Sequence, residues 1–65
     1  MRLRDLREDA DLTQAAVAEA LCVRQNTYSQ YENGKRQLPI DVLIRLARFY
    51  GVTTDYILEL SDTKE

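Results

Sequence analysis

Histidine and tryptophan are absent from this sequence, and cysteine occurs once. The chain therefore lacks a ligand set for a tetrahedral zinc site, a partner for a disulfide, and any Ser–His or Cys–His catalytic pair. One proline and two glycines among 65 residues favour helices with short connections. No apolar run approaches the ~20 residues that cross a bilayer, and no stretch resembles a signal peptide. These absences predict a cytoplasmic protein that is not an enzyme and has no cofactor, metal, membrane or small-molecule site.

The charge of the chain is unevenly distributed along its 65 residues, a length that allows one small domain. The net charge is −2 and the isoelectric point about 5.0, which by itself argues against nucleic acid as a partner. Residues 24–39, however, carry Arg24, Lys35 and Arg36 against a single acid, Glu32. This middle segment is the only one with a positive net charge, so any phosphate-binding surface must be local.

Hydrophobic periodicity predicts five helices, with no internal repeat and no domain boundary. We expect them over residues 2–10, 14–21, from 24 or 25 to 33, 39–50 and 53–60. The predicted fold class is all-α, a compact five-helix bundle. Residues 1–60 form the domain and residues 61–65 a polar C-terminal tail.

Capping residues and apolar spacing set these helix limits. Thr13 and Thr53 are expected N-caps, Asn33–Gly34 and Gly51 are helix stops, and Pro39 is the expected first residue of the fourth helix. Apolar residues at helical spacing predict the buried faces of the first and fourth helices: Leu3, Leu6 and Ala10, and then Ile40, Leu43, Leu46, Ala47 and Tyr50.

Residues 14–34 contain the most informative pattern. Two short helices joined by about three residues must cross steeply, so the second one projects from the body of the protein. Ala18 is small enough for the crossing point. Apolar residues are spaced to hold the turn and the inner face of the second helix: Val17, Leu21, Val23, Tyr28 and Tyr31. We favour packing over base stacking for the two tyrosines.

The outer face of this projecting helix is rich in amides and carries no charge. It consists of Gln25, Asn26, Ser29, Gln30 and Asn33. An amide donates and accepts hydrogen bonds at once, which suits the edges of DNA bases. Groups suited to phosphates surround this face: Thr13, Gln14, Arg24, Asn33, Lys35 and Arg36. The alternative interpretation is an ordinary solvated surface.

Three stretches carry a resemblance to a known family: LTQAAVAEAL (12–21), YSQYENGKR (28–36) and RLARFYGVTTDYIL (45–58). Together they resemble the helix-turn-helix domain of phage repressor and Cro type, the XRE-like family, over nearly the whole chain. The resemblance implies a lambda-repressor-like bundle in which the second and third helices form the helix-turn-helix. It also implies that the helix over 25–33 enters the major groove of double-stranded DNA.

The resemblance further implies roles for individual positions. Gln25, Asn26 and Gln30 align with base-reading positions, and Ser29 with one that contacts bases in some members. Gln14, Asn33 and Lys35 align with positions that contact the DNA backbone. Arg7 and Glu32 align with a structural ion pair between the first helix and the recognition helix.

Two positions depart from the family pattern. Cys22 stands where the family usually has glycine, and a left-handed residue there costs about 1–2 kcal/mol relative to glycine. Arg24 stands where a Ser or Thr N-cap is usual, and a lost cap costs ~1 kcal/mol. We interpret Arg24 as a phosphate clamp or a guanine reader. We expect Cys22 at the edge of the core, with redox sensing as the alternative.

The last predicted helix has apolar residues on more than one face, which makes Tyr56, Ile57 and Leu60 candidates for a dimer interface. The alternative is that this helix only closes the core. The function implied is a transcriptional regulator, a repressor, that binds a palindromic operator as a homodimer. A protein–protein interaction module or antitoxin-like subunit with the same fold is the alternative.

Overall fold

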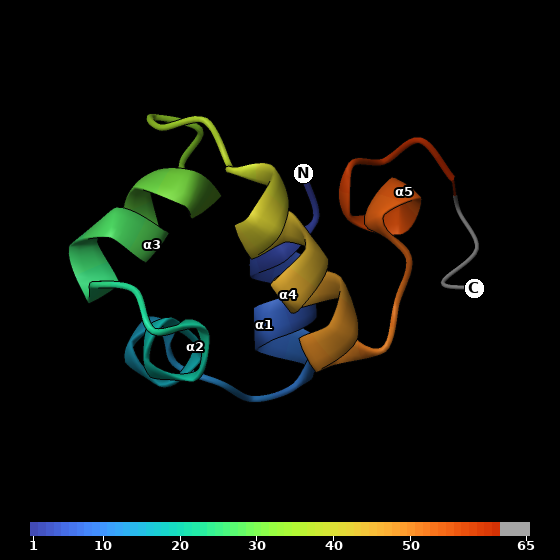
Figure 1. The fold of residues 1–65 in the computed structure, drawn as a ribbon. Helices are drawn as coiled ribbons and strands as arrows, with labels where there is room; N and C mark the ends of the chain where they lie inside the picture. Colours follow the sequence, from blue (N-terminus) through green and yellow to red (C-terminus); the bar gives the residue numbers. More distant parts are fainter. Residues whose placement is uncertain (62–65) are drawn as a thin grey trace.

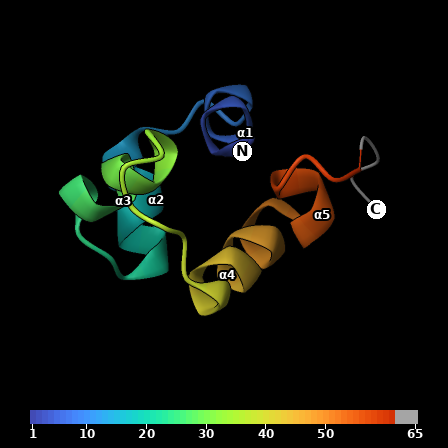
Figure 2. The ribbon, with the colours of Figure 1, turned by 90° about the horizontal axis from the view of Figure 1, so that it is seen from above.

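The computed structural model describes residues 1–61, and four of the five residues of the predicted tail lie outside that range. Within these residues five helices follow one another: α1 (Leu3–Asp9), α2 (Gln14–Leu21), α3 (Gln25–Glu32), α4 (Ile40–Tyr50) and α5 (Thr54–Ile57). Residues 1–61 contain no strand, so the predicted all-α five-helix fold is confirmed. Figure 1 shows α2 and α3 on one side of the molecule and α5 on the other, with α1 and α4 between them. The view from above in Figure 2 gives the same order.

Side-chain caps begin two of the helices. Oγ1 of Thr13 accepts a hydrogen bond from the backbone N–H of Ala16 at 3.1 Å at the start of α2. Oγ1 of Thr53 accepts one from Tyr56 at 3.0 Å at the start of α5. Both N-cap predictions are therefore confirmed. Pro39 lies one position earlier than predicted, because it occupies the N-cap of α4 in an extended conformation.

All five helices end in the same backbone motif. A residue with positive φ follows each helix, and the next N–H reaches back five residues to a carbonyl, as Val23 does to Ala18 at 3.0 Å. This Schellman arrangement satisfies carbonyls that the helix end leaves without a partner. Glycine supplies the left-handed residue after α3 and α4, whereas Asp11, Cys22 and Glu59 supply it elsewhere. The last of these ends α5 at Ile57, earlier than the predicted limit at residue 60, because Glu59 has φ 64°.

The core is formed by side chains from every helix. Its buried members are Leu3, Leu6, Val17, Ala18, Leu21, Tyr28, Tyr31, Val42, Leu46, Ala47 and Ile57. Two predicted core residues prove to be exposed. Ala10 follows the last residue of α1 and is therefore off its buried face. Ile40 lies on the first turn of α4 at the edge of the buried face set by Val42 and Leu46, and it is 74% exposed.

Candidate nucleic-acid interface

The turn between α2 and α3 has the helix-turn-helix geometry that the sequence suggests. Ala18 and Leu21 are buried in α2, and the chain reverses through Cys22 at φ 59° before α3 begins. The left-handed turn is thus retained although a cysteine stands at the glycine position. Contrary to our expectation of a core-edge position, Cys22 is exposed, because a left-handed residue after a helix projects its side chain into solvent here.

The outer face of α3 is directed away from the core. Gln25 and Asn26 are exposed, and Ser29 and Gln30 are half-buried. The opposite face packs inward through Tyr28, which is fully buried, and Tyr31. Burial also raises the pKa of Tyr28, so the phenol stays neutral. The two tyrosines therefore pack in the core, and the amides occupy the exposed side, in agreement with the spacing of the sequence.

Asn26 has a second function at the start of α3, which sequence reasoning missed. Arg24 occupies the N-cap position and offers no side-chain hydrogen bond there. Oδ1 of Asn26 instead accepts from the backbone N–H of Thr27 at 2.9 Å. This contact satisfies a backbone N–H that would donate its hydrogen bond to the side-chain oxygen of a serine or threonine N-cap. In this conformation the NH₂ group of Asn26 has no partner within residues 1–61, and one lone pair of its carbonyl oxygen is used by Thr27.

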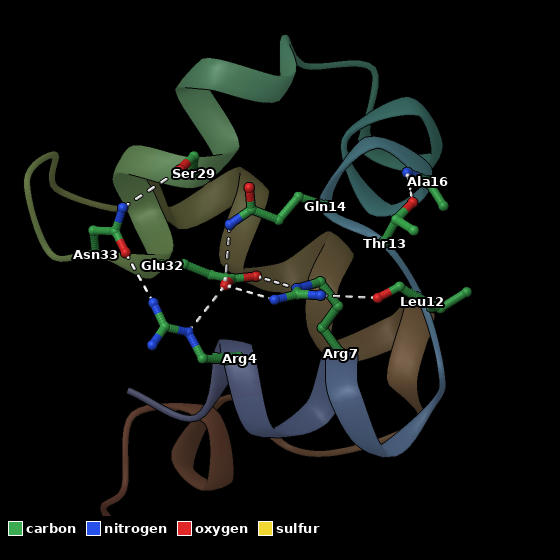
Figure 3. Close-up of polar contacts among 9 residues, drawn as sticks. All are labelled: Arg4, Arg7, Leu12, Thr13, Gln14, Ala16, Ser29, Glu32 and Asn33. Atoms are coloured by element: carbon green, nitrogen blue, oxygen red, sulfur yellow. Dashed lines mark hydrogen bonds and ion pairs between the residues drawn. The ribbon is translucent and has the colours of Figure 1, made fainter.

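Glu32, the last residue of α3, is the centre of a polar cluster (Figure 3). Its side chain is fully buried and accepts two hydrogen bonds from Arg7, at 2.7 Å from Nε and 3.3 Å from Nη2. Arg7 also donates to the backbone carbonyl of Leu12 at 2.9 Å. The expected ion pair between the first helix and the recognition helix is thus present. Burial acts to raise the pKa of Glu32, but its hydrogen bonds, the most effective of them from Arg7, outweigh burial and hold that pKa below its usual value.

Gln14 and Thr13, both expected at phosphates, have contacts within the protein. Nε2 of Gln14 donates to Oε1 of Glu32 at 3.3 Å, so the side chain extends from the start of α2 toward the end of α3. Thr13 caps α2, as described above. The cluster therefore joins α1, α2 and α3 through a single carboxylate, and it fixes the start of α2 relative to α3.

The end of α3 is the second polar region of the interface. Asn33 is exposed, accepts a hydrogen bond from Nη2 of Arg4 at 3.0 Å and donates one to Oγ of Ser29 at 3.4 Å. Arg4, which sequence reasoning missed, is a second α1 residue, beside Arg7, that reaches this end of the helix. Its signal in the sequence was its position one turn before Arg7 on the same helix. Lys35 and Arg36 are exposed in the loop that follows Gly34.

The three candidates for a dimer interface differ in exposure. Ile57 is fully buried, so it contributes to the core and cannot contact a partner subunit as predicted. Tyr56 is half-buried, and the guanidinium of Arg2 lies 4.3 Å from its ring centroid. Leu60 is 74% exposed. Because α5 ends at Ile57, Leu60 belongs to the turn after it, where its side chain is free of the helix.

The part of the chain that the structure describes has neither a metal-binding cluster nor a membrane-spanning helix. Residues 1–61 contain no cluster of three or more His, Cys, Asp or Glu side chains placed to hold a metal ion. Within the same residues, every helix is too short or too polar to pass through a membrane.

Comparison with known proteins identifies the class. The family model described as Helix-turn-helix matches residues 3–57, so the chain belongs to this helix-turn-helix family. The family is one of DNA-binding regulators rather than enzymes. The chain is 43% identical over 61 residues to the uncharacterized HTH-type transcriptional regulator YobD of Bacillus subtilis, covering 94% of the chain and 54% of that protein.

Two further relatives are similar over most of the chain. The cryptic phage CTXphi transcriptional repressor RstR of Vibrio cholerae is 39% identical over 95% of the chain and 56% of its own length. The HTH-type transcriptional regulator ImmR of Bacillus subtilis is 40% identical over 88% of the chain and 45% of its own length. The chain thus spans about half the length of these relatives. No solved structure gave a significant match.

Proposed function

We propose that this chain binds double-stranded DNA sequence-specifically by inserting α3 into the major groove, and that it thereby regulates transcription as a repressor. The observation that carries the proposal is the exposed, uncharged amide face of α3. Gln25 and Asn26 are exposed, and the half-buried Gln30 lies further along the same helix. An uncharged surface of amides is matched to base edges, since each amide can pair with a donor and an acceptor.

In this proposal the base-reading residues are Gln25, Asn26, Ser29 and Gln30, and the phosphate contacts come from Thr13, Gln14, Arg24, Asn33, Lys35 and Arg36. The proposed contacts at phosphates rely partly on the side chains of Lys35 and Arg36, which are exposed beyond α3. At the α2 end they rely on backbone N–H groups, because the side chains of Thr13 and Gln14 are engaged within the protein. The number of cations is small, so the salt dependence of binding is expected to be modest.

The proposal includes a homodimer on a palindromic operator in the cytoplasm. A two-fold dimer presents two recognition helices to half-sites about 34 Å apart, one turn of DNA. Exposed apolar side chains beyond α5 supply a surface for it, Leu58 at 39% and Leu60 at 74%. The relative RstR is named a transcriptional repressor, and its similarity to this chain supports repression as the direction of regulation here.

Selection of duplexes from a random-sequence pool tests the proposal. The expected result is enrichment of a palindromic site, bound with two protomers per duplex. The matched control is a chain in which Gln25 and Gln30 are both replaced by alanine, which keeps the charge and the fold. A wild-type chain that enriches no site, or enriches the same site as the control, would contradict the proposal.

A protein–protein module is the second candidate function. It is favoured by the exposed apolar side chains Ile40, Ile44 and Phe49 on α4, which lie outside the recognition helix. Retention on random duplex DNA at low salt separates the two candidates. A protein that passes through such a column unretained, yet associates with itself in solution, would support the module instead.

A further inference from the structure

The side-chain amide of Asn33 is held at both ends, within the interface proposed above. Its Oδ1 accepts from Nη2 of Arg4 at 3.0 Å, and its Nδ2 donates to Oγ of Ser29 at 3.4 Å. Figure 3 shows the three side chains in line, from α1 across the end of α3 and back along that helix. A residue outside the helix-turn-helix is thereby connected to a side chain proposed to read bases.

The direction of this hydrogen-bonded chain is fixed by the chemistry of Arg4. A guanidinium only donates hydrogen bonds, so the Asn33 atom that faces it must be the carbonyl oxygen. The NH₂ group of Asn33 then has to face Ser29, and Oγ of Ser29 has to accept. The hydroxyl hydrogen of Ser29 consequently remains available for an outside partner.

Arg4 is itself anchored by the polar cluster. Its Nε lies 3.6 Å from Oε1 of Glu32, whose carboxylate is held by Arg7. The planar guanidinium therefore spans Glu32 and Asn33 at once. A lysine at this position would keep the charge, but its single ammonium group on a flexible stem lacks that two-point geometry.

The polarity of Ser29 matters for which base it favours. In the major groove guanine and thymine present only acceptors, cytosine presents only the N4 donor, and adenine presents one of each. A hydroxyl that already accepts from Asn33 favours an acceptor on the base. Without Arg4 the amide of Asn33 is free to rotate, and its oxygen then accepts the hydroxyl hydrogen of Ser29.

We propose that Arg4 is a positioning residue that, through Asn33, sets Ser29 as a hydrogen-bond donor to the DNA base it faces. The proposal rests on the proposed DNA binding and concerns one end of that interface. The hydrogen-bonded chain runs from Arg4 through Asn33 to Ser29 and does not include the side chain of Gln25, so Gln25 should retain its base preference when Arg4 is changed.

The test compares the wild-type chain with Arg4→Lys and Arg4→Gln, using duplexes selected from a random pool by the wild-type chain. Dissociation constants are measured for the selected duplex and for each single base-pair change. We expect both variants to lose about threefold to tenfold in discrimination at the base pair that Ser29→Ala also affects, a size ordinary for coupled residues of one network. The base pair affected by Gln25→Ala keeps its preference. Arg48→Gln, which removes an exposed charge from α4, is the matched control. It should leave the preference at both of these base pairs unchanged.

A double-variant measurement separates positioning from direct charge. In an Asn33→Ala background, Arg4→Lys should have no further effect on discrimination, because the connecting side chain is gone. The proposal is overturned if Arg4→Lys discriminates as the wild-type chain does, or if its discrimination falls equally at all base pairs. It is also overturned if the effects of Arg4→Lys and Asn33→Ala on discrimination are additive, or if Ser29→Ala keeps the wild-type base preference. Circular dichroism at the assay temperature establishes that each variant is folded. A wild-type chain that selects no duplex refutes the proposed function itself, whereas selection without an Arg4 effect refutes only this inference.

Discussion

Arg7 and Glu32 lie 25 residues apart in the chain and are joined by two hydrogen bonds, at 2.7 and 3.3 Å. The side chain of Glu32 is fully buried, and 16% of the side chain of Arg7 is exposed. A buried carboxylate without its partner is costly, so the pair makes the placement of α3 depend on α1. Gln14 adds a link from α2 to the same carboxylate. The orientation of the recognition helix, α3, therefore depends on its contacts with both α1 and α2.

Replacing Arg7 by methionine should destabilise the fold by about 3–5 kcal/mol, because the buried carboxylate of Glu32 would lose both hydrogen bonds from its main cation. Glu32→Gln should cost less, since the amide oxygen still accepts from Arg7. Urea unfolding followed by circular dichroism measures both changes. An Arg7→Met variant within about 1 kcal/mol of wild type, an ordinary value for an exposed pair, would show that the contact contributes little.

The stability of the fold should decrease in acid through Glu32. Its pKa is lowered in the folded state from the usual 4.5. A carboxyl whose pKa is lower in the folded state than in the unfolded state stabilises the fold at pH values above its unfolded-state pKa. That stabilisation is lost as the pH falls through its folded-state pKa. The free energy of unfolding should therefore fall as pH drops below about 4.5, and Glu32→Gln should flatten this decline. Urea titrations between neutral and acid pH test it.

The control for the acid effect is Glu19→Gln, which removes an exposed carboxylate from α2. That variant should decline in parallel with wild type. If Glu32→Gln declines equally steeply, the pH dependence originates elsewhere in the chain.

Cys22→Gly should stabilise the fold. Cys22 has φ 59°, which costs an L-residue about 1–2 kcal/mol, while glycine gives back part of this through its greater freedom in the unfolded chain. We expect a net gain of roughly 0.5–1 kcal/mol, read from thermal or urea unfolding. Ala20→Gly, within α2, is the matched control and should destabilise by about 1 kcal/mol. A loss of stability in Cys22→Gly would contradict the strain argument.

Gln25→Ala and Gln30→Ala should each relax base preference by about 1–3 kcal/mol at one position per half-site. Lys35→Ala should instead weaken binding to all sequences alike and reduce the salt slope by about 0.9. Binding measured over a series of salt concentrations and base-substituted duplexes distinguishes the two classes. Equal behaviour of the three variants would refute the division into base and phosphate contacts.

Leu60→Glu should shift the protein toward the monomer if the turn after α5 closes the proposed dimer. Ile40→Glu is the matched control, because Ile40 is equally exposed, at 74%, on α4. Light scattering at high micromolar concentration reads the mass of each. A wild-type chain that is already a monomer there, and that binds DNA without cooperativity, would remove the dimer from the proposal.

Local patterns in the sequence predicted the helices well, because capping and periodicity act within a few residues. Thr13 and Thr53 begin helices as expected, and the amide face of α3 is directed away from the buried Tyr28. Predictions failed near helix ends. Ala10 and Ile40 continue an apolar spacing but lie at the limits of their helices, and Glu59 ends α5 early by its backbone conformation.

The sequence by itself determined the number and order of the helices, the buried face of α3 and membership of the helix-turn-helix class. These features follow from side chains within one or two turns of each other. Only the tertiary structure decided that Ile57 belongs to the core, that Asn26 caps α3 and that Arg4 reaches Asn33 across 29 residues. Such contacts depend on how the helices are placed against one another, and hydrophobic burial fixes that placement for the whole domain at once. A side chain on the surface of one helix therefore acquires its partner only when the core has formed.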